Sequence, residues 1–153
     1  MSRSWLGLAA LVLLAATGCQ QQVSKNSEPT LKEIKKDVIE EGKGDPVKTG
    51  DTVYMEYTGR LMDGTEFDGN VDSDGAPYMV VLGASMVIKG WDEGIVGMKV
   101  GEKSKLSIPS EKAYGPAGSP PKIPANADLQ FEVKVLGAVK KGEEALHDLK
   151  DDK

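Results

Sequence analysis

The chain has few of the residues that carry most metal-dependent and nucleophilic chemistry: its 153 residues include one cysteine and one histidine. A single cysteine, Cys19, excludes an intramolecular disulfide. His147 lies in the charged C-terminal segment, where it supplies material for neither a histidine-based triad nor a histidine zinc site. Walker loops and dinucleotide-binding glycine motifs are also absent. We therefore expect a site that uses neither a metal nor a cofactor.

Long hydrophobic runs are equally scarce, and the one present lies at the start of the chain. Residues 6–16 are all small or apolar and follow Arg3, which is the pattern of a secretory signal peptide. This run is shorter than the roughly 20 apolar residues that a membrane-spanning helix needs. The pattern therefore predicts a cleaved signal peptide over residues 1–18.

Cys19 ends the stretch AATGC, which resembles a bacterial lipobox with Ala16 where leucine is common. The resemblance implies that Cys19 becomes the acylated N-terminus of an exported protein and anchors it to a membrane surface. Gln20 is not the aspartate associated with retention in the inner membrane, so a Gram-negative source would favour the outer membrane. The alternative is an ordinary signal peptide followed by a cysteine without a role.

The remaining segments divide by composition. Cleavage after residue 18 removes Arg3 and lowers the basic residues from 19 to 18 against 24 acidic ones, which argues against nucleic acid as a partner. Residues 19–30 are polar and aperiodic, as in a flexible tether, and residues 140–153 form a mixed-charge tail, frayed or briefly helical, without chemistry. Residues 31–139 suffice for one domain, which we expect to be monomeric because no dimerisation segment precedes it.

Most of this domain alternates apolar and polar residues, the pattern of strands buried on one face. In residues 51–61, Val53, Met55 and Tyr57 alternate with polar or half-polar neighbours. Residues 102–110 and 128–138 alternate in the same way, a shorter strand is expected in 78–83, and a weaker one in 31–42.

The period changes between Gly83 and Gly101, where apolar residues recur at helical spacing: Val87, Ile88, Trp91, Ile95 and Met98. This spacing predicts a helix of two or three turns that begins at residues 89–91. Several strands and one helix predict an α+β fold in which an antiparallel, twisted sheet of about five strands wraps around one short helix.

An acidic loop raises a separate hypothesis. Asn70, Asp72, Asp74 and Gly75 match the start of an EF-hand loop, but its twelfth position is Val81 instead of glutamate, and no helices flank it. A solvated turn is the simpler interpretation, and a calcium-responsive surface protein is the weakest functional hypothesis.

Three stretches carry a family resemblance: VYMEYTGRLMDGTEFDGN, VLGASMVIKGWDEGIVGMKVGEKSKLSIPSEKAYGPAG and IPANADLQFEVKVL. They resemble, in the same order, the FK506-binding protein (FKBP) type of peptidyl-prolyl cis/trans isomerase. The resemblance runs from about residue 47 to residue 139 and implies an antiparallel sheet around one helix. It also implies proline-containing polypeptides as substrates and FK506-like macrolides as ligands.

The resemblance assigns a shallow apolar pocket in which Trp91 forms the floor under the substrate proline. It implies that Asp68, Tyr114, Ile88, Trp91 and Phe67 are catalytic. It implies that the substrate also contacts Tyr57, Tyr78, Val87, Ile123 and Phe131. The N–H of Ile88 and the hydroxyl of Tyr114 are expected to hold substrate carbonyls, while Asp68, held by Tyr57, organises the rim or polarises a carbonyl. Taken singly, each apolar member would be assigned to core packing.

Such a site needs no nucleophile. The barrier of about 18–20 kcal/mol to rotation arises from amide resonance. Twisting reduces the charge separation of the planar amide, so a dry apolar pocket favours the twisted form.

Departures from the family pattern concern the rim. The arginine that usually follows the "FD" motif and pairs with the aspartate is missing, Ser119 replaces a frequent histidine, and Lys122 replaces an apolar residue. Tyr78 stands where phenylalanine is usual. We expect these changes to alter substrate preference and macrolide affinity more than isomerisation.

Two main hypotheses follow. The first is a membrane-tethered prolyl isomerase that acts on exported proteins, and retention of Phe67, Asp68, Trp91 and Tyr114 favours it. The second is a module that binds proline-containing segments as a chaperone or scaffold without turnover, which the missing arginine favours.

Overall fold

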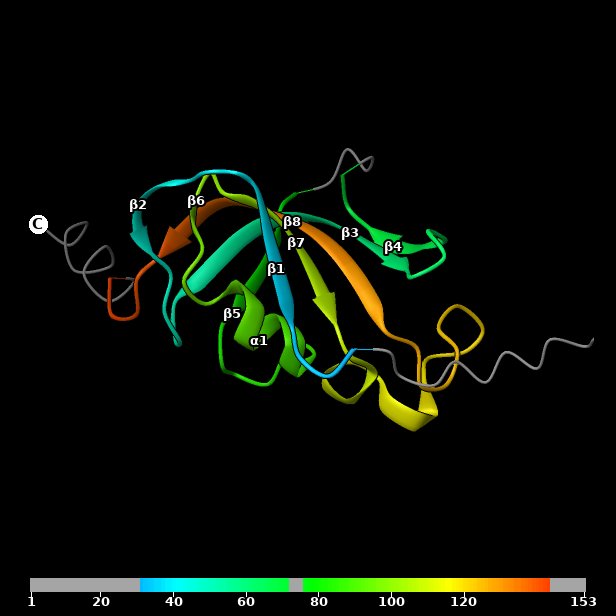
Figure 1. Cartoon of the computed structure of the whole chain (residues 1–153). Coiled ribbons are helices and arrows are strands. Elements are labelled where there is room, and N and C mark those ends of the chain that lie inside the picture. Colours follow the sequence, from blue (N-terminus) through cyan, green and yellow to red (C-terminus); the bar gives the residue numbers. More distant parts are fainter. Residues whose placement is uncertain (1–30, 72–75, 144–153) are drawn as a thin grey trace, which may run out of the picture.

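The computed structural model describes residues 31–71 and 76–143 (Figure 1). The strands are β1 (Lys35–Glu40), β2 (Lys43–Pro46), β3 (Thr52–Leu61), β4 (Glu66–Gly69), β5 (Tyr78–Val81), β6 (Lys99–Val100), β7 (Lys103–Ile108) and β8 (Leu129–Val139). One α-helix, α1 (Lys89–Ile95), and two 3₁₀ turns, η1 (Ser110–Lys112) and η2 (Gly115–Ala117), complete the elements. The predictions on the signal peptide, Cys19 and most of the tail lie outside the described residues.

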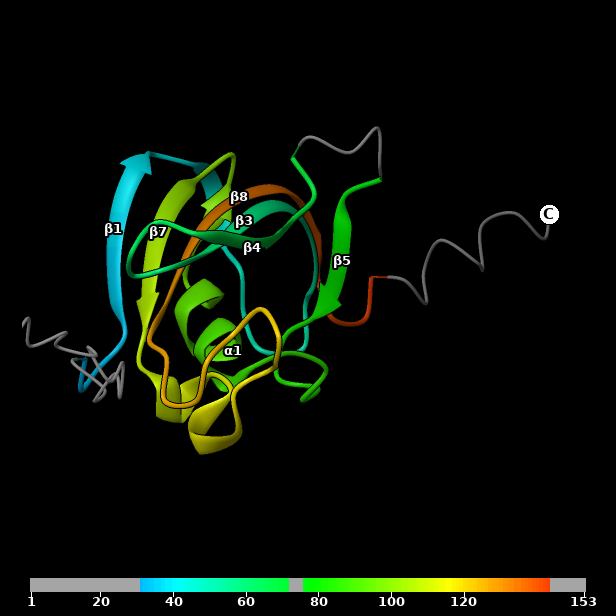
Figure 2. The same cartoon turned by 90° about the vertical axis from the view of Figure 1, so that its right-hand side faces the viewer.

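The main sheet is antiparallel and curved. Its strand order is β1-β7-β8-β3-β4, and β5 pairs with β3 beside β4. The longest pairing, β3 with β8, runs from Thr52 opposite Val139 to Leu61 opposite Leu129, and a bulge interrupts it between Tyr54 and Met55. Bulges bend a strand and increase its twist. The sheet arches over α1, which lies in its concave side (Figure 2).

The core lies between the concave face and the helix, as the alternation predicts. On β3, Val53, Met55 and Tyr57 are buried, while Tyr54 and Glu56 between them are half-exposed. The helix buries Gly90, Trp91, Gly94 and Ile95 against the sheet. The α+β prediction, with one short helix inside an antiparallel sheet, is therefore confirmed.

The helix is as short as expected, with seven residues from Lys89 to Ile95. It ends in a tight turn, in which Val96 leaves the helical conformation with a ψ of 130°, Gly97 adopts a φ of +89° that glycine reaches at little cost, and the N–H of Met98 donates to the carbonyl of Ile95 at 2.9 Å. Met98, expected on the helix face, lies beyond that turn and is fully buried.

The structure contains more strands than the predicted number of about five. The main sheet has six, and β2 pairs with β6 in a separate two-stranded sheet. The four residues of β4, Glu66 to Gly69, carry two charges and a glycine and so show no apolar alternation. They pair with β3 because a tight turn reverses the chain, with the N–H of Gly64 donating to the carbonyl of Leu61 at 2.9 Å.

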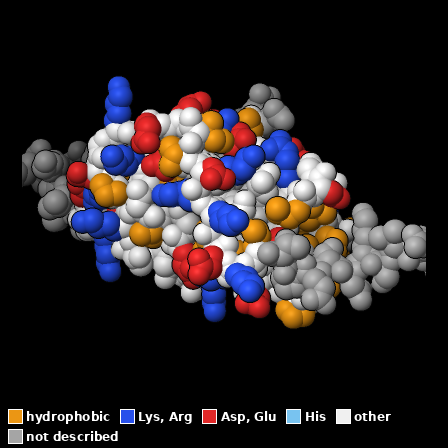
Figure 3. Space-filling view, viewed as in Figure 1, with side chains coloured by type: hydrophobic (Ala, Val, Ile, Leu, Met, Phe, Trp, Pro, Cys, Tyr) orange, Lys and Arg blue, Asp and Glu red, His pale blue; other side chains and the backbone are white. Residues whose placement is uncertain are grey.

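Charged side chains of both signs are interspersed over the side of the molecule on which β1 and α1 lie (Figure 3). Lys103 pairs with Glu132 at 2.7 Å across β7 and β8. Partly exposed pairs of this kind contribute about 0–1 kcal/mol each to stability, so they add little to what holds the fold together. Within the two described ranges, no helix combines the length and the apolar character needed to cross a bilayer.

Candidate active site

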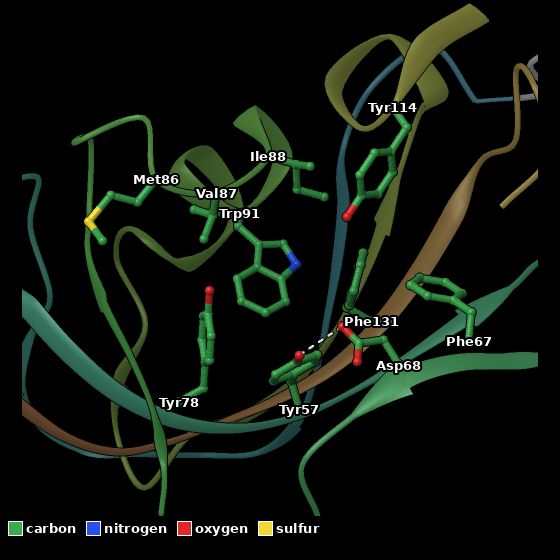
Figure 4. A pocket seen from close by; sticks show the side chains of 10 residues that line it. All are labelled: Tyr57, Phe67, Asp68, Tyr78, Met86, Val87, Ile88, Trp91, Tyr114 and Phe131. Atoms are coloured by element: carbon green, nitrogen blue, oxygen red, sulfur yellow. Dashed lines mark hydrogen bonds between the residues drawn. The ribbon is translucent and has the colours of Figure 1, made fainter. Parts of the chain in front are cut away.

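A pocket of about 340 Å³ opens between α1, β4, β5 and the segment around η2. Ten residues line it: Tyr57, Phe67, Asp68, Tyr78, Met86, Val87, Ile88, Trp91, Tyr114 and Phe131 (Figure 4). Strands β3, β4, β5 and β8 supply five of them, and the others come from α1 and the segments before α1 and η2. The pocket therefore exists only in the assembled sheet.

Trp91 forms the floor, and other aromatic rings hold it at right angles. Its ring centroid lies 4.9 Å from that of Tyr57, 5.1 Å from that of Phe131 and 5.9 Å from that of Tyr78, all edge-to-face. Edge-to-face pairs are the favoured arrangement of aromatic rings. The buried Nε1 has no hydrogen-bond partner among the described residues, so ring packing holds the indole in place.

The wall beside the floor depends on Gly59 of β3. Phe67 and Phe131 cross there at 90° with centroids 5.6 Å apart. A Cβ at position 59 would lie 2.8 Å from atoms of both rings, closer than carbon atoms approach. Glycine is thus required where two rings meet over the strand.

One edge of the pocket is polar. Asp68 is exposed, and the Tyr57 hydroxyl donates to its Oδ2 at 2.9 Å, as the resemblance implies. The N–H of Gly69 donates to Oδ1 at 3.0 Å. Burial, together with the bond to Asp68, raises the pKa of Tyr57, which keeps its hydroxyl a neutral donor.

The opposite polar group is Tyr114, between η1 and η2, whose hydroxyl points into the pocket (Figure 4). Burial and the nearby charge of Asp68 raise the pKa of Tyr114 above its usual value. Ile88, immediately before α1, lines the pocket, and its N–H donates to no residue of the described part of the chain. A hydroxyl and an N–H are thus available for acceptors on a bound molecule.

The sequence model described as FKBP-type peptidyl-prolyl cis-trans isomerase matches residues 43–136. The chain belongs to this family. This isomerase is 54% identical over 93 residues to the human peptidyl-prolyl cis-trans isomerase FKBP2, covering 60% of this chain and 65% of that one. It is 51% identical over 100 residues to the mouse FKBP2, covering 64% of this chain and 71% of the relative. The chain is therefore an enzyme of the peptidyl-prolyl cis/trans isomerase class.

Two further relatives extend the comparison. The FK506-binding protein 1 of Saccharomyces cerevisiae is 48% identical over 104 residues, or 67% of this chain and 90% of the relative. The crystal structure of FkpA from Escherichia coli superposes with a TM-score of 0.63 at 44% identity, over 71% of this chain. The isomerase spans 49% of that longer chain, so the likeness concerns one part of FkpA.

Nine of the ten positions that the resemblance assigns to the pocket line it, and Ile123 does not. Ile123 is buried in the core, where its backbone pairs with that of Ser119 in both directions at 2.9 Å. This pairing closes a narrow loop, and Ile123 belongs to the core instead of the pocket lining.

The structure adds Met86 to the pocket, a residue that sequence reasoning missed. Its side chain is 64% exposed and lies at the side of the pocket away from Tyr114 and Phe67 (Figure 4). Its position directly before Val87 and Ile88, which the resemblance assigned to the pocket, was the sequence feature that could have indicated it. An exposed methionine there widens the apolar rim of the isomerase.

The hypothesis of an EF-hand-like calcium loop gains no support from Asn70, the one of its three Asn and Asp residues that the structure describes. The side chain of Asn70 accepts a hydrogen bond from the N–H of Tyr57 at 2.8 Å and donates to the carbonyl of Met55 at 3.2 Å. Asn70 therefore extends the pairing between β3 and β4. Asp72 and Asp74 lie outside the described residues.

Proposed function

We propose that this isomerase accelerates rotation about Xaa-Pro bonds in exported polypeptides while a lipid on Cys19 holds it at a membrane surface. The observation that carries the catalytic part is the pocket: a rigid floor of perpendicular rings with a hydroxyl and a carboxylate at its edges. A prolyl ring is small and apolar and fits such a floor. The carbonyls beside it need donors at the rim.

The energetics favour shape and desolvation as the main contribution. Uncatalysed exchange takes tens of seconds. Millisecond turnover requires about four powers of ten in rate, or roughly 5–6 kcal/mol. One neutral hydrogen bond contributes only about 0.5–1.5 kcal/mol. The Tyr114 hydroxyl and the Ile88 N–H therefore orient the substrate, and the apolar floor favours the twisted amide over the planar one.

Asp68 acts in this proposal as an organiser of the rim. Each of its oxygens already accepts a hydrogen bond, from Tyr57 and from Gly69. Rotation about a C–N bond transfers no proton, so a general base has no step to perform. The carboxylate instead polarises or orients a substrate carbonyl indirectly through the groups that it holds.

The decisive experiment measures cis/trans exchange of a short Leu-Pro peptide by NMR. The parent chain is compared with a Trp91→Ala, Asp68→Ala double variant whose folding is checked by circular dichroism. We expect acceleration by the parent and at least a tenfold loss, about 1.4 kcal/mol, in the variant. A parent that binds the peptide without accelerating its exchange would instead be the binding module.

The family's ligand chemistry gives a second part of the proposal. One relative is named an FK506-binding protein, and the aromatic pocket of this chain offers the same kind of apolar surface. We expect FK506 to raise the melting temperature of the isomerase by an amount that grows with its concentration. An unchanged melting temperature at concentrations far above the protein would argue against macrolide binding.

The anchor is tested separately. The chain is expressed in a bacterium with labelled palmitate, beside a Cys19→Ser variant. Label and membrane association are expected for the parent, while the variant should lose both because a single cysteine is available for acylation. Membrane association that persists in the variant would contradict lipid anchoring without affecting the isomerase proposal.

A further inference from the structure

Lys122 reaches from the loop between β7 and β8 to the strand that carries two residues of the site. Its Nζ donates a hydrogen bond to the backbone carbonyl of Phe67 at 2.9 Å, across 55 positions of sequence. Asp68, at the polar edge of the pocket, follows Phe67 directly. The ammonium group forms no ion pair within the described ranges.

The carbonyl that Lys122 binds lies at an irregularity in β4. Gly59 of β3 pairs with Asp68 and Arg60 with Glu66, so Phe67 is the extra residue of a bulge. A bulge disrupts the ladder at the extra residue. Lys122 therefore provides a partner at the point where β4 is least firmly paired with β3.

The loop that carries Lys122 is braced by its own backbone. Ser119 and Ile123 exchange two hydrogen bonds of 2.9 Å, and Ile123 is buried in the core. At Gly118 a Cβ would lie 2.5 Å from the carbonyl oxygen of Ile123, so the two sides of the loop are in direct contact. The two sides of the loop are therefore held together by backbone contacts.

The same loop is continuous with Tyr114. Gly115, the next residue, accepts a hydrogen bond of 2.9 Å from the N–H of Asn126 at the far end of the loop. The loop is thus closed at its base beside Tyr114 and at its tip beside Lys122. Lys122 and Tyr114 therefore lie in one continuous segment that backbone hydrogen bonds close at both ends.

We propose that Lys122 is a positioning residue that couples this loop to β4 and so sets the spacing between Tyr114 and Asp68 across the pocket. The inference rests on the proposed function, because the spacing matters only if both groups orient a substrate. The chain lacks the arginine that the family pattern places beside Asp68. Lys122 instead brings an ammonium group to the backbone carbonyl of Phe67, the residue before Asp68.

The kinetic test uses the purified full chain in detergent with Lys122→Met, which keeps the length of the stem and removes the ammonium. We expect kcat for the Leu-Pro peptide to fall about three- to tenfold with KM within about twofold, because orientation acts on the transition state. Lys122→Arg keeps a donor and should restore kcat to within about twofold.

The matched control is Lys43→Met, the same change on the exposed strand β2, which should leave both constants unchanged. An unchanged kcat in Lys122→Met would overturn the proposal. So would a rise in KM confined to peptides with an acidic residue beside proline, since that would show a direct charge contact with the substrate.

Hydrogen exchange tests the coupling without reference to activity. The amides of Ser119 and Ile123 should exchange about fivefold faster or more in Lys122→Met, and at the parent rate in Lys122→Arg. Equal exchange in all three proteins would show that Lys122 does not hold the loop. If the parent fails to accelerate peptide exchange, the proposed function fails, while this measurement still decides the coupling.

Discussion

Tyr57 shows how much one side chain of the site does. Its ring packs edge-to-face against Trp91 at 4.9 Å, and its hydroxyl holds Asp68 at 2.9 Å. The ring belongs to the core and the hydroxyl to the polar edge. A change that removes only the hydroxyl therefore separates the two contributions.

Tyr57→Phe should lower kcat/KM about three- to tenfold, because the lost hydrogen bond is of the order of 0.5–1.5 kcal/mol and Asp68 keeps only the hydrogen bond from the N–H of Gly69. The melting temperature should change little, since the ring remains. Tyr54→Phe, on the same strand and half-exposed, is the control and should retain full activity. Full activity in Tyr57→Phe would show that Asp68 needs no such restraint.

Tyr57 and Tyr114 together predict how the activity depends on pH in the alkaline range. Burial and the Asp68 carboxylate raise the pKa of both Tyr57 and Tyr114. A tyrosine donates its proton to a hydrogen bond only while protonated, so a raised pKa preserves both donors above the ordinary value of about 10. We expect kcat/KM to stay within about twofold between about pH 7 and pH 9.5. A loss of activity centred near pH 8 or 9 would contradict this.

At the scale of elements, the position of Trp91 depends on how closely α1 approaches β7. A Cβ at Gly90 would lie 2.3 Å from Cγ2 of Ile108, whereas one at Gly94 would lie 3.0 Å from Cδ1 of Leu106. Both glycines are buried on the face of the helix toward the sheet. The helix can contact the sheet this closely only where it carries no side chain.

Gly90→Ala should destabilise the protein by about 1–3 kcal/mol, because the added methyl group forces α1 away from β7. Gly94→Ala should cost less, since a flexible leucine can adjust and alanine favours the helix by up to about 1 kcal/mol. Urea denaturation of the two variants checks the ranking. Equal or reversed destabilisation would show that the helix is free to shift.

At the scale of the whole molecule, two buried aspartates fasten the ends of the described chain. Asp128 accepts hydrogen bonds from the N–H of Leu31 at 2.8 Å and of Ser110 at 2.9 Å. Asp51 accepts from the N–H of Lys48 at 2.9 Å and of Lys141 at 3.0 Å. The bonded structure therefore extends to Lys141, into the segment expected to be the tail.

The pKa of Asp51 predicts how acid affects its hydrogen bonds to Lys48 and Lys141. Burial raises the pKa, but the N–H groups of Lys141 and Lys48 and the Lys140 ammonium outweigh it and hold the pKa below its usual value. A carboxylate whose pKa is lower in the folded state than in the unfolded chain stabilises the folded protein fully at pH values above its unfolded pKa of about 4. This stabilisation is lost as the pH falls through the pKa of the folded state.

Asp51→Asn should therefore lower the free energy of unfolding by about 1–3 kcal/mol at pH 7 and by much less at about pH 2.5. Urea midpoints at the two pH values measure the difference. Asp37→Asn on the exposed strand β1 is the control and should have little effect at either pH. A destabilisation by Asp51→Asn that is independent of pH would contradict the role of the charge.

Local patterns in the sequence predicted the long strands and the helix because burial on one face imposes its period on consecutive residues. The alternation of Val53, Met55 and Tyr57 and the spacing from Val87 to Ile95 are such patterns. A single aromatic residue fits a core as well as a pocket. The aromatic residues of the pocket were identified because several family motifs occur in the right order along the chain. The short strand β4 carries no period and was not predicted.

The sequence alone thus determined the α+β architecture, the chemical types in the site and the family, because these depend on which residues are near each other along the chain. Only the tertiary structure decided that Ile123 is buried in the core and does not line the pocket, that Met86 does line it, and that Lys122 donates a hydrogen bond to Phe67. These contacts depend on the curvature of the sheet and on a bulge in β4, which bring residues 55 positions apart into contact, and no local period records such distances.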